Sequence, residues 1–133
     1  MLKIVHLSSV HKAFDQRIFH RECVTLANAG HRVTLIACHN RDEVKEGVHV
    51  KPVAPLATQQ PGLHLFQRRA RTRRAYQMAL KENADVYHFH DAELIGVGLK
   101  LKRRGAKVIF DCHEDNPGYA MQKHYLPYFV RVI

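Results

Sequence analysis

Two short segments of the sequence, residues 86–91 and 108–115, end in ionisable side chains that could do chemistry. An imidazole titrates near neutral pH, and a neighbouring carboxylate can fix its tautomer and raise its basicity, so such a pair can move a proton or stabilise a charge. Imidazole and carboxylate groups are also metal ligands. The candidate residues are His88, His90, Asp91, His113, Glu114 and Asp115.

The residues alone leave three interpretations open. His88 and His90 are two positions apart, so on a strand both point to the same side and could begin a metal site that His113 completes. However, His-x-His-Asp followed by His-Glu-Asp matches no zinc hydrolase motif, and we expect no bound metal. The second interpretation is acid–base or electrostatic work without a metal. The third is structural, with Asp91 as the N-cap of the next helix and His88 as a core histidine.

The elements that must position these residues are strands that alternate with helices. Each cluster follows a short apolar run rich in β-branched and aromatic residues, which is typical of a strand buried between helices. This alternation predicts an α/β fold with an open, mostly parallel Rossmann-like sheet and helices on both faces. Ligands bind outside the carboxyl ends of such strands, so we expect both clusters on one rim. The predicted strands are 2–7, 32–38, 48–53, 86–90 and 107–111, and the predicted helices are 16–29, 63–82 and 92–104.

Local signals support these boundaries. Asp15 is a good N-cap, with Phe14 and Phe19 at the spacing of a hydrophobic staple, and Gly30 stands where a helix ends. Pro52 predicts that its strand is short or lies at an edge. Residues 8–13 and 39–47 are predicted loops. The buried face of the last helix is predicted to consist of Leu94, Val97, Gly98 and Leu101.

Composition limits the class of protein. A chain of 133 residues with 46% hydrophobic and 25% charged residues can form one domain with a real core. No apolar run approaches the ~20 residues of a spanning helix, and the start does not resemble a signal peptide, so we expect a cytoplasmic protein. The three cysteines are odd in number and far apart, which favours reduced thiols. A net charge of +9 suits an anionic partner.

Much of that charge lies in the predicted helix 63–82. Its basic side chains form either a solvated helix face or a docking surface for phosphates or an anionic membrane. We expect no nucleic acid as partner, because no aromatic residues are interleaved with the basic run. We expect no dinucleotide cofactor either, because the loop 8–13 has no glycine. The docking residues are Arg68, Arg69, Arg71, Arg73 and Arg74.

Four segments in order resemble a known family. They are His11-x-x-x-Asp15-x-Arg17-Ile18-Phe19-x-x-Glu22, then Leu26-Ala27-x-x-Gly30-His31-x-Val33, then His88-x-His90-Asp91, and then Asp111-x-His113-Glu114. Together they resemble the amino-terminal domain of family 4 glycosyltransferases, and more narrowly the branch that makes bacterial surface polysaccharides. The resemblance covers residues 1–115, a Rossmann-like amino-terminal domain. Residues 116–133 would begin a further segment of that domain in a longer protein.

The resemblance implies a GT-B enzyme in which two Rossmann-like domains face each other across a cleft. This chain would be the acceptor-binding half, and the missing carboxyl-terminal domain would bind the nucleotide-sugar donor. Such enzymes generally retain anomeric configuration and need no metal or cofactor. Many act on lipid-linked acceptors at the inner face of the cell membrane, where this protein would be peripheral. The chain alone would be inactive.

The resemblance also implies roles for single residues. His113 would meet the transferred sugar and is the predicted catalytic residue. The predicted substrate-binding residues are Asp15, Arg17, His90, Asp91 and Glu114. The alternative function is a metal-dependent hydrolase that uses His88, His90, Asp91 and His113.

Overall fold

The computed structural model describes residues 1–55 and 64–112, which form one six-stranded sheet. The strand order is β3-β4-β2-β1-β5-β6, and every neighbouring pair is parallel except β3 with β4. The fold class is therefore the predicted one. The strands are β1 (Lys3–Lys12), β2 (Arg32–Cys38), β3 (Glu43–Lys45), β4 (Val48–Ala54), β5 (Val86–Phe89) and β6 (Lys107–Phe110).

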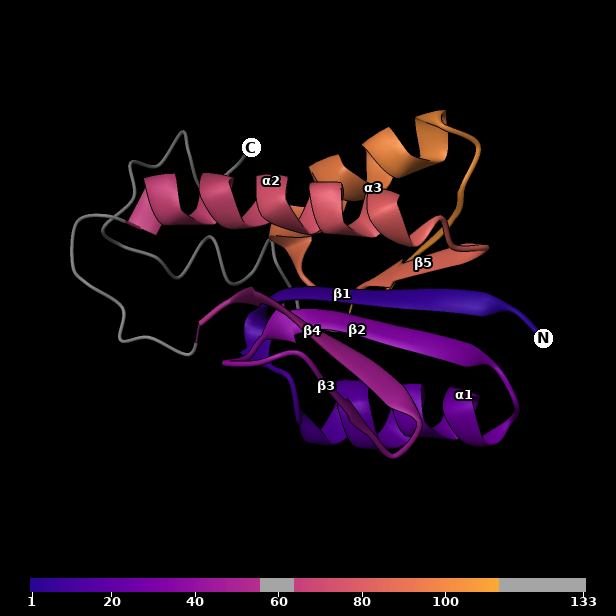
Figure 1. Ribbon diagram of the computed structural model, residues 1–133. Helices are drawn as coiled ribbons and strands as arrows, with labels where there is room; N and C mark the ends of the chain where they lie inside the picture. The colour runs from indigo at the N-terminus through magenta and orange to yellow at the C-terminus, as the bar shows by residue number, and fades with distance from the viewer. Residues whose placement is uncertain (56–63, 113–133) are drawn as a thin grey trace.

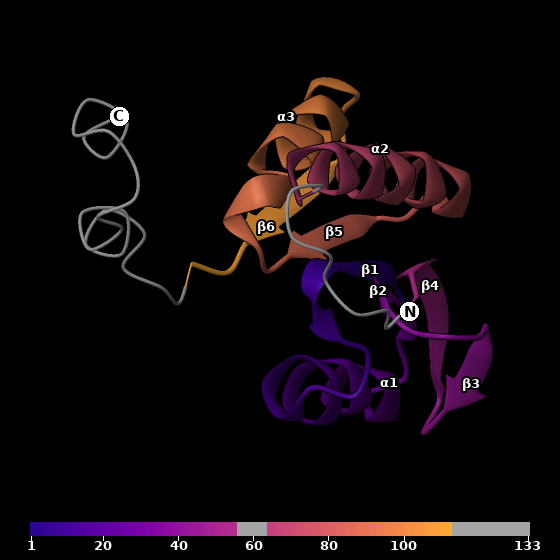
Figure 2. The ribbon, with the colours of Figure 1, turned by 90° about the vertical axis from the view of Figure 1, so that its left-hand side faces the viewer.

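Helices cover both faces of the sheet. In Figure 1, α2 and α3 lie on one side of the strands and α1 on the other, and Figure 2 shows the same layers from the side. The π-helix η1 leads directly into α1, and the 3-10 turn η2 leads directly into α3. The helical elements are η1 (Gln16–Cys23), α1 (Val24–Asn28), α2 (His64–Glu82), η2 (Ala92–Leu94) and α3 (Ile95–Arg103).

The sheet separates two apolar cores. Val5, Leu7 and Phe89 belong to the core beneath α2 and α3, whereas Phe19 and Leu35 belong to the core beneath η1. Burial of a side chain such as Phe19, which is fully buried, contributes about 1.5–3 kcal/mol. Because side chains alternate along a strand, the residues between those of the first core must point toward η1. This alternation sends three histidines to the η1 face.

Several local predictions are confirmed. The Asp15 carboxylate accepts hydrogen bonds from the backbone N–H groups at the start of η1. The Phe14 and Phe19 rings meet edge to face with their centroids 4.9 Å apart. The predicted inner face of α3 is buried throughout. Gly98 lies so close to the Phe89 ring that an added Cβ would come within 2.3 Å of it, so this glycine serves helix packing.

Other boundaries differ from prediction. The strand expected to end at Leu7 continues to Lys12, because side-chain contacts described below keep the next residues extended. The predicted loop 39–47 contains β3, which returns to β4 through Glu46 and Gly47, both at positive φ. Pairing of β3 with β4 stops at Val50, so the following proline does lie on a strand edge among the described residues.

Two further predictions concern thiols and membranes. Cys23 and Cys38 are buried, Cys112 is exposed, and no disulfide forms among the described residues. Burial raises the pKa of the Cys23 thiol. Within the same residues, no helix combines the length and the apolar character needed to cross a bilayer.

Candidate functional site

Three histidines meet at the carboxyl edge of the two central strands. His6 of β1 and His88 of β5 are direct partners in the parallel register, and His90 follows two residues later on the same side. The ring centroids are 4.7 Å apart for His6 and His88, 5.3 Å for His6 and His90, and 4.4 Å for His88 and His90. His6 Nδ1 and His90 Nε2 are 3.0 Å apart and share a hydrogen bond.

The helix η1 brings a carboxylate to these rings. Glu22 Oε2 lies 3.8 Å from His6 Nδ1, 3.8 Å from His88 Nδ1 and 3.6 Å from His90 Nε2. The i to i+5 hydrogen bonds of a π-helix align residues that are five apart, and Arg17 Nη1 accordingly lies 3.7 Å from Glu22 Oε1. We call His6, Glu22, His88 and His90 the histidine cluster.

Asp111, directly after β6, connects this cluster to Arg17. Its carboxylate forms an ion pair with the Arg17 guanidinium, and its Oδ2 lies 3.3 Å from His90 Nδ1. Partial burial would raise the pKa of Asp111, but the hydrogen bond and charge of Arg17 outweigh it and lower the pKa. Asp111 is therefore an anion that orients His90 through one ring nitrogen and is itself neutralised by a cation.

The imidazoles of the cluster are neutral at neutral pH. Burial lowers the pKa of His6 well below its ordinary value, and the adjacent His88 and His90 add to this effect. Burial also lowers the pKa of His88, and it lowers that of His90 to about 4. The cluster therefore offers ring nitrogens as hydrogen-bond partners or as ligands, and it does not act as a store of positive charge.

Asp91 has a different role from the one predicted. It makes no side-chain cap to the helix that follows. Instead, Asp91 Oδ2 accepts hydrogen bonds from Ser8 Oγ at 2.8 Å and Ser9 N at 2.7 Å, and Oδ1 lies 3.0 Å from His11 Nδ1. The interpretation as an N-cap is wrong because these donors from β1 take the carboxylate. They also explain why β1 continues beyond Leu7.

The Asp91 carboxylate and the His11 imidazole form a charged pair. The hydrogen bond to Asp91 raises the pKa of His11. Burial would raise the pKa of Asp91, but hydrogen bonds from His11, Ser8 and Ser9 lower it. Asp91 is thus committed to the loop end of β1. It does not belong to the group of described residues whose spacing suits a metal ion, which removes one residue from the hydrolase alternative.

The structure brings together only some of the predicted site residues. Arg17 and His90 meet through Asp111, and Asp15 serves as a cap, accepting from the backbone N–H groups of Arg17 and Ile18. The predictions on His113, Glu114 and the segment 116–133 lie outside the described residues.

Sequence reasoning did not select His6 or Glu22 as site residues. A histidine inside an otherwise apolar strand was the available signal for His6, and the five-residue spacing from Arg17 was the signal for Glu22.

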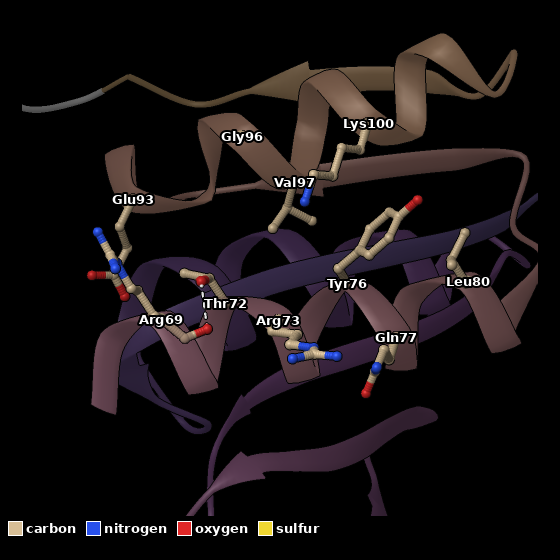
Figure 3. A pocket seen from close by; sticks show the side chains of 10 residues that line it. All are labelled: Arg69, Thr72, Arg73, Tyr76, Gln77, Leu80, Glu93, Gly96, Val97 and Lys100. Carbon is tan, nitrogen blue, oxygen red and sulfur yellow. Dashed lines mark hydrogen bonds between the residues drawn. The ribbon is translucent and has the colours of Figure 1, made fainter. Parts of the chain in front are cut away.

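The five arginines lie on α2, on the opposite face of the sheet from the histidine cluster. Between α2 and α3 there is a groove of about 550 Å³, shown in Figure 3 with side chains of both helices facing it. Arg69, Arg73 and Lys100 line it together with one carboxylate, Glu93. Lys100 Nζ lies 5.3 Å from the centre of the Tyr76 ring. The groove is open, basic and partly aromatic.

The remaining arginines of α2 stand around this groove. Arg68 Nε lies 3.4 Å from Glu93 Oε2, Arg71 is half-buried, and Arg74 is exposed. Only two of the predicted docking residues therefore line the groove itself. The others extend the basic surface along the helix.

Comparisons with known proteins agree on the fold. The structure aligns with sucrose-phosphate synthase from Thermosynechococcus elongatus with a TM-score of 0.68 at 15% identity, over 98% of this chain and 38% of that one. It also aligns with the carboxyl-terminal domain of a hydrogenase from Pyrococcus furiosus with a TM-score of 0.53 at 17% identity, over 83% of this chain and 91% of that one. No curated protein sequence matches the chain. The likeness to the synthase confirms the predicted GT-B type of α/β fold, and this chain spans 38% of that protein's length.

A family assignment comes from the sequence itself. The model of Glycosyltransferase Family 4 matches residues 16–132, nearly the whole chain. The match begins in η1, the helix that carries Arg17 and Glu22, and it includes the segments that carry His88, His90 and Asp111. The chain belongs to glycosyltransferase family 4.

Proposed function

We propose that this chain is the acceptor-side domain of a nucleotide-sugar-dependent glycosyltransferase in polysaccharide or glycolipid biosynthesis. Its family membership supports transfer of a sugar, and the donor would be bound mainly by a second domain. The observation that carries the proposal is the convergence of Arg17, His90 and Asp111 at the carboxyl edge of the strands. Ligands bind at this edge in open α/β sheets.

The arrangement suggests how an acceptor is held. Arg17 and Asp111 present a cation and an anion that are both partly exposed, with 33% and 27% of their side chains accessible, so sugar hydroxyl groups can hydrogen-bond to either. His90 is fully buried behind them and acts by fixing Asp111. Asp91 acts one step further away by holding the end of β1. In this proposal Asp15 and Arg17 occupy the first loop, and Glu114 joins the acceptor side.

The chemistry proposed at the reacting centre needs no metal or cofactor, and we propose that it retains the anomeric configuration. His113 would contact the transferred sugar and stabilise charge as the bond to the nucleoside diphosphate breaks. The acceptor hydroxyl attacks the anomeric carbon, loses its proton, and the nucleoside diphosphate leaves. This domain alone would not turn over without its donor-binding partner.

A transfer assay on the intact protein tests this function. Purified protein would be incubated with a panel of nucleotide sugars and an extract of membrane lipids, and release of nucleoside diphosphate would be measured. We expect release with at least one sugar and a loss of at least about tenfold in His113→Ala, because a positioned group at a reacting centre contributes at least this much. Absence of release with every donor, or full turnover by the variant, would contradict the proposal or the role of His113.

A second proposal concerns membranes. The basic surface of α2, centred on Arg69 and Arg73, is open to solvent and lies away from the acceptor edge, so it could dock the protein on anionic lipid while the site remains accessible. Each arginine near such a surface contributes about 1 kcal/mol. A peripheral position of this kind would suit a lipid-linked acceptor.

Vesicle co-sedimentation tests the docking surface. We expect binding that grows with anionic lipid content and falls at least about tenfold when Arg69 and Arg73 are both changed to Glu. The matched control changes Arg21 and Arg32, two exposed arginines outside α2, to Glu. Equal losses in the two double variants, or binding indifferent to lipid charge, would reject the proposal.

A further inference from the structure

Four side chains from separate elements converge on one point beneath η1. One ligand atom from each of His6, Glu22, His88 and His90 lies within 4.8 Å of all the others. The individual distances are 3.0 Å from His6 Nδ1 to His90 Nε2 and 3.6 to 3.8 Å from Glu22 Oε2 to the three rings. Donor atoms around a tetrahedral metal with bonds of about 2.0–2.2 Å lie roughly 3.3–3.6 Å apart. The spacing therefore suits a cation in the centre.

Hydrogen bonds within the protein do not account for this cluster. The Nε2 atoms of His6 and His88 are buried and have no hydrogen-bond partner. His6 is completely buried, so solvent does not compensate its ring nitrogen. A buried polar atom without a partner costs about 1–3 kcal/mol, and its presence in a native site indicates that something other than protein completes it.

The surroundings of His90 match those of a metal-bound imidazole. Its Nδ1 faces Asp111 Oδ2 at 3.3 Å, which directs the Nε2 lone pair toward Glu22 and His6. A carboxylate behind the ring fixes the tautomer of metal-ligating histidines in this way. Arg17 holds Asp111 in turn, so the support extends to a second layer.

We propose that His6, Glu22, His88 and His90 together bind one zinc ion. Three imidazoles and one carboxylate suit zinc in ligand type and number. Because four protein ligands fill a tetrahedral shell, the site is closed and structural, without an open position for a substrate. Zinc would fasten η1 to β1 and β5 and so fix Arg17 at the edge. This inference goes beyond sugar transfer, whose chemistry remains free of metal.

Zinc uptake by the intact protein, made without a polyhistidine tag, tests the site. The protein would be stripped with a chelator and returned to buffer containing zinc, and bound metal would be measured by mass spectrometry. We expect one zinc per chain, a higher melting temperature with zinc, and the visible absorption of four-coordinate cobalt when Co²⁺ replaces it. This readout does not depend on transferase activity, so it can succeed or fail separately from the proposed function.

Three variants make the test specific. Glu22→Gln and His88→Gln change ligands that are only partly buried, so they should fold, and we expect each to weaken zinc affinity at least about 100-fold. Asp111→Asn removes the support of one ligand and should cost about tenfold. The matched control is His49→Gln, an exposed histidine on β4 that pairs with Asp42, and it should bind zinc like the parent.

Two results would overturn the proposal. One is a protein that takes up no zinc at stoichiometric concentration and whose melting temperature zinc does not change. The other is equal affinity in Glu22→Gln, His88→Gln and the parent, since zinc would then be held by histidines elsewhere on the chain.

Discussion

The histidine cluster and the groove between α2 and α3 lie on opposite faces of one sheet and differ in construction. The cluster is buried, and its side chains come from β1, η1 and the end of β5, so it exists only when the sheet has its native register. The groove is open and lined by two helices that are amphipathic in their own right. We infer that changes behind the cluster spread through several elements, whereas changes at the groove remain local.

Removal of one carboxylate on each side should break this comparison most strongly. Asp91→Ala leaves the Ser8 and Ser9 donors and the His11 ring at a buried site without their acceptor, and we expect a loss of about 3 kcal/mol in the free energy of unfolding. Glu93→Ala removes an ion pair with an exposed arginine and should cost less than about 1 kcal/mol. Urea unfolding monitored by circular dichroism measures both. Similar losses would show that the two regions are not built differently.

Two glycines two residues apart on α3 sharpen the comparison. Gly98→Ala forces a Cβ against the Phe89 ring of β5 and should destabilise the protein by about 1–3 kcal/mol. Gly96→Ala faces open space at the groove and should stabilise it by about 0.5–1 kcal/mol through helix propensity. Thermal melting of the two variants should therefore shift in opposite directions. A shift in the same direction would mean that α3 does not pack on β5 as described.

The smallest expected effect is a pH dependence away from both regions. Burial would raise the pKa of Glu82 at the end of α2, but the ammonium groups of Lys51 and Lys3 outweigh it and lower the pKa. The stabilisation is therefore fully present above the ordinary value of 4.5 and is lost as the pH falls through the folded-state pKa. The effect is modest because 30% of Lys3 and 28% of Lys51 remain exposed.

Glu82→Gln tests this pH dependence. The variant should have a flatter stability curve between pH 6 and 3, expected from the ordinary range of carboxyl titration. Unfolding in urea at several pH values gives the slope, with Glu46→Gln on an exposed turn as control. An unchanged slope in Glu82→Gln would assign the acid sensitivity to other carboxylates.

Local sequence signals predicted what depends on neighbours in the chain. The Asp15 cap, the helix end at Gly30 and the buried face of α3 each follow from spacing within one element, and each is confirmed. The hydrophobic alternation of β1 and β5 also predicted that their polar residues would share an edge. Fold class and the position of the rim were therefore accessible from sequence.

The composition of the site was not accessible in the same way. His6 and His88 meet because β1 and β5 pair in one register, and no pattern within either strand states that register. Glu22 reaches the rings because η1 is a π-helix, whereas the helix propensity of its residues predicts an α-helix. Asp91 was misread for a related reason, since its partners are on a strand more than eighty residues earlier.

The central claim is that sugar transfer takes place at the carboxyl edge beneath η1 and not in the groove. The most direct measurement is the rate of transfer from nucleotide sugar to a detergent-soluble acceptor by the intact protein, with Arg17→Ala compared with Arg73→Ala. We predict that Arg17→Ala loses at least about tenfold in kcat/KM while Arg73→Ala remains within about twofold of the parent. Loss in Arg73→Ala with full activity in Arg17→Ala would contradict the account.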